Sequence, residues 1–168
     1  MKSGKVLKQS DYGLIPLMNF GVLFSNMQLF RSAQPIHRYQ YEWLARTLNA
    51  KSIINLRDEA DIDTKMVGEA GIPFHFTIQV KDHQPPTMDD AMQFYHLIQQ
   101  CIKPVLIHCE HGHGRTSTFS VITKMAYGMT LEDALKDERE RFHYEFKHKA
   151  QEEFLYEFDK HLKQLQSK

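Results

Sequence analysis

A cysteine, five further residues and an arginine form the segment of this chain best suited to chemistry. They are Cys109 and Arg115, preceded by the apolar run 104–107. This spacing suits a loop that wraps a phosphate dianion, with a thiolate beneath the phosphorus and a guanidinium on its oxygens. Successive backbone amides in such a loop form an anion-binding nest, and a helix that begins there adds partial positive charge. We call residues 109–115 the phosphate loop.

The residue types inside the phosphate loop agree with this role. Gly112 and Gly114 permit the positive φ or the close backbone approach that a tight loop requires. Arg115 is placed at the start of a helix, where its planar fork can bind two phosphate oxygens at once. Cys109 lies where the same dipoles favour a thiolate, so we expect a nucleophile at neutral pH. The alternative is a small buried Cys109 with Arg115 as a surface charge at a helix start.

Residues 108–116 resemble the signature loop of the cysteine-dependent protein tyrosine phosphatase superfamily, His-Cys-x-x-Gly-x-Gly-Arg-Thr. The resemblance implies that the Cys109 thiolate attacks phosphorus, that Thr116 donates a hydrogen bond to it and that His108 orients the loop. No metal or other cofactor is implied. The substrate-binding residues implied by the resemblance are Glu110, His111, Gly112, His113, Gly114 and Arg115.

A second motif lies upstream, at residues 82–86, which we call the acid loop. Its sequence, Asp-His-Gln-Pro-Pro, resembles the Asp-x-x-Pro-Pro acid loop of small dual-specificity and related phosphatases. A leaving alkoxide or phenoxide needs a proton from an acid above the pocket, on a loop that can close. Asp82 is therefore the expected general acid. The alternatives are Asp58, Asp89 and Asp90, with Asp82 merely beginning a polar turn.

Segments 29–35 and 52–57 are similar to those of bacterial and fungal atypical dual-specificity phosphatases, a group that includes inositol phosphate phosphatases and tyrosine-phosphatase-like phytases. The resemblance then covers residues 22 to 140. It suggests that Arg31 and Arg57 line the pocket rim and meet additional substrate phosphates. The alternative is that both arginines end strands and pair with Asp58 or Glu59.

Four positions depart from the family pattern or are distinctive. His111 replaces the usual alanine and Ser117 the usual glycine, while Glu110 and His113 are also distinctive. His113 would carry a positive charge only below about pH 6.5 unless its surroundings change that. The predicted function is a dual-specificity protein phosphatase acting on tyrosine and serine or threonine phosphates. The alternatives are an inositol phosphate or phosphoinositide phosphatase and an inactive phosphate-recognition module.

Two other chemical interpretations are less consistent with the residues. A metal site would use His108, Cys109, His111 and His113, but no second Cys/His cluster in the sequence completes four ligands. A rhodanese-type sulfur transferase usually has a shorter loop without the His-Cys…Arg-Thr frame. Cys101 is expected to be a plain core residue, and the alternative is a resolving thiol for oxidised Cys109.

Composition predicts an ordinary enzyme domain. The 168 residues carry 21 basic and 21 acidic side chains, so no global charge would recruit nucleic acid or a membrane. Two cysteines make no disulfide framework, which favours a reducing cytosol. The N-terminal apolar stretch is broken by Asp11, Pro16 and Asn19, so we expect neither a signal peptide nor a membrane span. A monomer is expected, with a dimer surface on segment 141–168 as the alternative.

The alternation of apolar patterns predicts an α/β fold, with a mainly parallel sheet flanked by helices on both faces, as in dual-specificity phosphatases. We expect one phosphatase domain over 1–168, with a core at about 22–140 and a C-terminal helical segment at 141–168. The phosphate loop should follow a central strand. The expected strands are 22–24, 29–30, 52–56, 74–80 and 104–108; the expected helices are 36–49, 60–70, 87–102, 115–127, 130–140 and one through 150–165.

Overall fold

The computed structural model describes residues 12–26, 28–59 and 63–168. Its centre is a five-stranded sheet in the order β1-β2-β5-β3-β4, antiparallel between β1 and β2 and parallel elsewhere. The predicted α/β fold with a mainly parallel sheet is thus confirmed. The strands are β1 Gly21–Phe24, β2 Leu29–Ser32, β3 Ser52–Arg57, β4 Phe74–Val80 and β5 Val105–His108.

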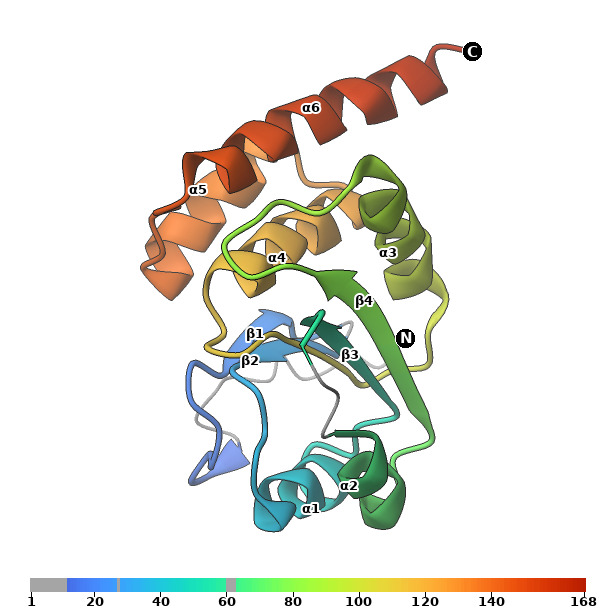
Figure 1. Cartoon of the computed structure of the whole chain (residues 1–168), viewed down its shortest axis with the longest axis vertical. Helices are drawn as coiled ribbons and strands as arrows, with labels where there is room; N and C mark the ends of the chain where they lie inside the picture. Colours follow the sequence, from blue (N-terminus) through green and yellow to red (C-terminus); the bar gives the residue numbers. More distant parts are fainter. Residues whose placement is uncertain (1–11, 27, 60–62) are drawn as a thin grey trace.

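Helices cover both faces of this sheet (Figure 1). Helices α1 and α2 lie on one face, and α3 to α6 lie on the other. The helices are α1 Arg38–Arg46, α2 Asp63–Ala70, α3 Met88–Gln100, α4 Gly114–Ala126, α5 Leu131–Phe142 and α6 Lys149–Gln166. Residues 60–62, the start of one expected helix, lie outside the described residues.

The central strands β3 and β5 carry apolar residues on both faces, because both of their faces are buried. Ile53 and Leu106 pack in the cluster under α1 and α2, whereas their neighbours Ile54 and Ile107 pack in the cluster under α3 to α6. All four side chains are at most 1 % exposed. Successive side chains in a strand point to opposite faces, so β3 and β5 contribute to both cores.

Local signals place the ends of several helices. Thr87 and Thr130 each accept a hydrogen bond from the backbone N–H three residues on, which begins α3 and α5 as predicted. Ile102 and Leu165 continue the helical spacing of apolar residues in the sequence, but they are 55 % and 47 % exposed. Ile102 lies beyond the end of α3, and the last turns of α6 project past the rest of the molecule (Figure 1).

No helix in the described part of the chain is long and apolar enough to cross a membrane.

Candidate active site

The phosphate loop lies where the parallel strands end. It follows β5, the central strand, and leads directly into α4. Cys109 is 3 % exposed, and the Thr116 hydroxyl donates a 2.9 Å hydrogen bond to its sulfur. This placement at the carboxyl ends of parallel strands is where open α/β sheets bind ligands.

Neighbouring elements hold three consecutive carbonyl groups of the phosphate loop. The Gln34 N–H donates to the carbonyl of Glu110 at 3.0 Å, and the Asn19 amide donates to that of His111 at 2.6 Å. The carbonyl of Gly112 accepts from Arg31 at 2.7 Å. A trans peptide points its N–H away from its carbonyl, so this side of the loop takes the acceptors and leaves the donors for an anion.

Gly112 is required by both its backbone and its surroundings. Its φ is +74°, and a Cβ there would lie 2.6 Å from the backbone nitrogen of Ala33. Gly114 is constrained differently, because its Cβ would meet the side-chain oxygen of Gln151 at 2.8 Å. The two positions therefore require glycine for different reasons.

The guanidinium of Arg115 is fixed by two carboxylates and a carbonyl. Its two terminal nitrogens donate to both oxygens of Glu59 at 2.9 and 3.0 Å, and one also donates to the carbonyl of Val80 at 3.0 Å. The hydrogen bond from Arg115 lowers the pKa of Glu59 to about 2. Burial opposes the charge of Arg115, but its bonds to Glu59 raise its pKa. This pair keeps a permanent cation at the end of the phosphate loop.

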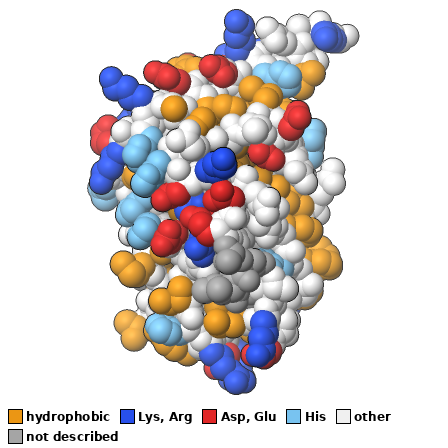
Figure 2. Space-filling model, in the orientation of Figure 1, with side chains coloured by type: hydrophobic (Ala, Val, Ile, Leu, Met, Phe, Trp, Pro, Cys, Tyr) orange, Lys and Arg blue, Asp and Glu red, His pale blue; other side chains and the backbone are white. Residues whose placement is uncertain are grey.

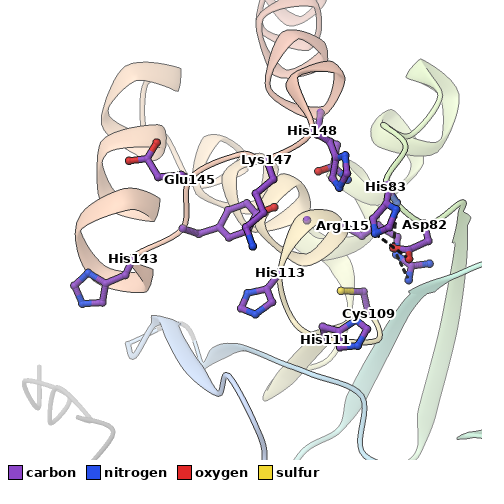
Figure 3. A pocket seen from close by; sticks show the side chains of 13 residues that line it. Asp82, His83, Cys109, His111, His113, Arg115, His143, Glu145, Lys147 and His148 are labelled. Carbon is purple, nitrogen blue, oxygen red and sulfur yellow. Dashed lines mark hydrogen bonds and ion pairs between the residues drawn. The ribbon is translucent and has the colours of Figure 1, made fainter.

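Asp82, the second of these carboxylates, lies across from Arg115 at the mouth of the site. Its Oδ1 is 3.3 Å from Nη2 of Arg115, and Asp82 and Cys109 line the same cavity (Figure 3). The other carboxylates considered as the acid lie elsewhere. Asp58 is outside the cavity lining, 4.0 Å from Arg115, and Asp89 and Asp90 lie in the first turn of α3.

The cavity has a volume of about 480 Å³ and is closed on one side by the chain between α5 and α6. Figure 3 shows Lys147 and His148 reaching toward it from this segment. In the space-filling view, histidines gather beside a group of acidic and basic side chains (Figure 2). The imidazole and ammonium groups in the lining belong to His83, His111, His113, His143, Lys147 and His148.

His113 is less basic than the sequence suggested. Burial, then the charges of Arg31, Lys147 and His111, lower its pKa below the ordinary value of 6.5. Its ring stacks on Tyr144 with 5.8 Å between centroids. At neutral pH the imidazole of His113 therefore lines the cavity without a charge.

Arg31 does not lie at the pocket rim, one of the two positions considered for it from the sequence. It is 2 % exposed and sits behind the phosphate loop, where it pairs with Glu138 of α5 and donates to the Ser117 hydroxyl at 3.0 Å. Lys124 also binds Glu138, at 2.6 Å. A buried cation needs such partners, because an unpaired charge away from water is costly. Ser117, at the usual glycine position, serves as one of them.

Arg57 and Glu110 also lie outside the cavity lining. Arg57 is 3.4 Å from Glu59, the pairing held as its alternative. Glu110 is exposed, and its carboxylate lies within 4.8 Å of those of Glu59 and Asp82. Among the described residues, these three carboxylates are the side chains close enough to one another to share a metal ion. The histidines and the cysteine considered as metal ligands form no such group there.

Cys101 is a buried thiol at the end of α3, and both cysteines are free. Burial raises the pKa of Cys101. These features match the plain core residue expected from the sequence.

Sequence reasoning missed two residues of the site. Glu59 was considered only as a partner of Arg31 or Arg57, although it is the bidentate partner of Arg115. Its place just after a buried strand, at the edge shared with the phosphate loop, is a signal for it. Gln151, on α6, lines the cavity with Cys109. No local pattern marks it, because it reaches the site only through the packing of α6.

Solved structures share this fold. The core catalytic domain of the PP-IP phosphatase Siw14 from S. cerevisiae matches with a TM-score of 0.74 and 20% identity, covering 92% of this chain and 94% of that one. Kinase associated phosphatase matches with a TM-score of 0.70 and 16% identity, over 85% and 93%. Receptor-type tyrosine-protein phosphatase eta of Mus musculus is 34% identical over 68 residues, which are 37% of this chain and 6% of that protein.

Fold and family together define a cysteine-dependent phosphatase of the dual-specificity and tyrosine phosphatase class. Within that class, the chain belongs to the family described as DSP-PTPase phosphatase fused to NAD+ kinase, whose model matches residues 23–157.

Proposed function

We propose that this chain hydrolyses phosphate monoesters of proteins, on tyrosine and on serine or threonine, through a phosphocysteine intermediate. The observation that carries the proposal is the grouping of Cys109, Arg115 and Asp82 around one cavity, with Thr116 bonded to the sulfur. A nucleophile, an anion-binding cation and an acid are the parts that phosphoryl transfer to a thiolate requires.

In the first step the Cys109 thiolate attacks phosphorus in line with the leaving oxygen. The amides of the phosphate loop and the guanidinium of Arg115 hold the equatorial oxygens as negative charge spreads over them. Asp82 donates its proton to the leaving oxygen as the ester bond breaks. The products are a phosphocysteine and the free alcohol or phenol.

In the second step water displaces the thiolate. Asp82, now a carboxylate, accepts a proton from that water as the oxygen attacks phosphorus, and inorganic phosphate is released. The Thr116 hydroxyl donates to the departing sulfur, which favours its negative charge. The positive field of the site comes from Arg115 and the loop amides, so the proposed cycle has no cofactor. Two free cysteines agree with action in a reducing cytosol.

An inositol phosphate is the second candidate substrate, and one feature of the cavity favours it. Lys147 and several histidines line a volume of about 480 Å³ beside Cys109, where a second phosphate of the same molecule could be bound. The relative Siw14, which shares the fold, is a PP-IP phosphatase. A flat protein segment would make fewer contacts with these lysine and histidine side chains.

The test is phosphate release, with a chelator present, from p-nitrophenyl phosphate, phosphotyrosine and phosphoserine peptides, phosphoinositides and inositol hexakisphosphate. We expect turnover that Cys109→Ser abolishes and a higher kcat/KM for the phosphopeptides. A higher kcat/KM for the inositol substrates would select the second candidate. Binding of these ligands without turnover by the wild-type chain would contradict the enzymatic proposal and indicate a recognition module.

A further inference from the structure

The acid loop depends on other elements for its position. Residues 81–84 are exposed, and their one internal backbone hydrogen bond joins the Gln84 N–H to the carbonyl of Lys81 at 3.1 Å. Exposed turns of this kind move readily unless other parts of the protein bind them. The position of Asp82 over the cavity therefore depends on its contacts with the phosphate loop and with α6.

The N-terminal end of α6 supplies two such contacts. The ring of His83 stacks on that of His148, with 4.3 Å between centroids, and the two rings lie together in Figure 3. The side-chain amide of Gln151 donates to the carbonyl of Gln84 at 3.3 Å. The residues that follow Asp82 in the turn are thus tied to the same helix.

Gln151 is an unusual residue for its location. It is 0 % exposed, and its Oε1 is buried with no hydrogen-bond partner among the described residues. The same side chain fills the space beside Gly114 in the phosphate loop. A buried amide oxygen without a partner has lost its hydrogen bonds to water and gained none in return, so packing alone would favour an apolar residue of this size.

We infer that Gln151 is a positioning residue for the general acid: with His148 it holds the acid loop against α6, so that Asp82 stays above Cys109. The inference rests on the proposed function, because it assumes that Asp82 protonates the leaving group. It gives α6 a part in catalysis beyond covering the sheet. The contact of Gln151 with both loops fixes the acid relative to the nucleophile.

The test is the dependence of rate on the leaving group. Gln151→Met keeps the volume and removes the donor. A poorly basic p-nitrophenolate leaves with little help, whereas phenolate needs the proton. We expect kcat/KM, which reports transfer of the phosphoryl group to Cys109, to fall roughly tenfold more for phenyl phosphate than for p-nitrophenyl phosphate, as a partial loss of general acid catalysis. Asp82→Asn should show the same pattern more strongly, and the double variant should be no slower than Asp82→Asn alone.

Controls separate this role from a structural one. Gln164→Met makes the same change at an exposed position of α6 and should leave both rates unchanged. His148→Ala, at a half-buried position, should reproduce the leaving-group effect without a change in the core. Equal losses on both substrates in Gln151→Met and His148→Ala, or no loss, would overturn the inference. If Asp82→Asn itself lacked the leaving-group effect, the proposed role of Asp82 would fail as well.

Discussion

The guanidinium of Arg31 donates a 2.7 Å hydrogen bond to the backbone carbonyl of Gly112, from the side of the phosphate loop that faces the interior. The same guanidinium pairs with Glu138, which is 0 % exposed. The loop that binds phosphate is therefore anchored to α5 through a buried ion pair. A substitution that removes Arg31 should therefore lower both stability and activity.

Arg31→Met should lower the free energy of unfolding by about 3 kcal/mol, because it leaves Glu138 with fewer partners for its buried charge. Urea denaturation measures this. The variant should also lose kcat while folded, since the Gly112 carbonyl is released. In the double variant Arg31→Met/Glu138→Met the total loss should be smaller than the sum of the single losses. Additive effects would contradict the pairing.

The two glycines of the phosphate loop should respond differently to alanine. Gly112→Ala places a Cβ 2.6 Å from the backbone of Ala33 and requires a φ of +74°, so neither the neighbour nor the backbone can yield cheaply. For Gly114→Ala the three nearest atoms all belong to the side chain of Gln151, and displacing a side chain costs less than displacing backbone. We expect Gly112→Ala to lose more thermal stability and more kcat than Gly114→Ala. The reverse order, in melting temperature and in rate, would contradict the loop geometry.

Thr116→Val removes the donor to the Cys109 sulfur and keeps the shape of the side chain. A hydrogen bond to a charged group contributes about 1.5–3 kcal/mol, so kcat should fall roughly 10- to 100-fold. The loss should appear in hydrolysis of the phosphocysteine, where the thiolate departs, and rapid-quench kinetics separates that step. Thr116→Ser keeps the hydroxyl and should retain most of the rate. Equal losses in both variants would refute the hydrogen bond's role.

Glu59→Gln should weaken both substrate binding and stability, because Arg115 loses its charged bidentate partner. The pKa of Glu59 is lowered from 4.5 to about 2 in the folded chain, so its contribution to stability is fully present above pH 4.5. That contribution is lost as the pH falls toward 2. The difference in unfolding free energy between the wild type and Glu59→Gln should shrink over this interval. A difference that stays constant would contradict the pairing.

Much of the fold followed from local patterns in the sequence. Buried strands such as β3 and β5 are short and rich in apolar residues, and Thr87 and Thr130 mark helix starts by their spacing to an acidic residue. The phosphate loop was evident because its chemistry needs its residues at fixed, adjacent positions. The ends of helices were predicted less well. Helix α1 stops at Arg46 rather than near residue 49, because Leu48 continues the apolar spacing of the helix but is buried from the turn that follows it.

The rest of the site depends on contacts between distant segments. Arg31 and Glu138 are far apart in the sequence, and nothing near Arg31 reveals that its charge is buried rather than at the rim. Likewise Gln151 reaches the cavity only because α6 packs across α4, and Glu59 meets Arg115 across the strand edge. Such pairings are set by tertiary packing, which one sequence does not encode in any short pattern.

The most direct test of the phosphocysteine mechanism is to trap the intermediate. The chain is mixed with excess p-nitrophenyl phosphate, quenched in acid within the first turnover and analysed by peptide mass spectrometry. We expect one phosphoryl group on the peptide that contains Cys109, with a matching burst of p-nitrophenolate, and neither in Cys109→Ser. Steady turnover with no burst and no phosphoryl group on Cys109 would contradict the mechanism.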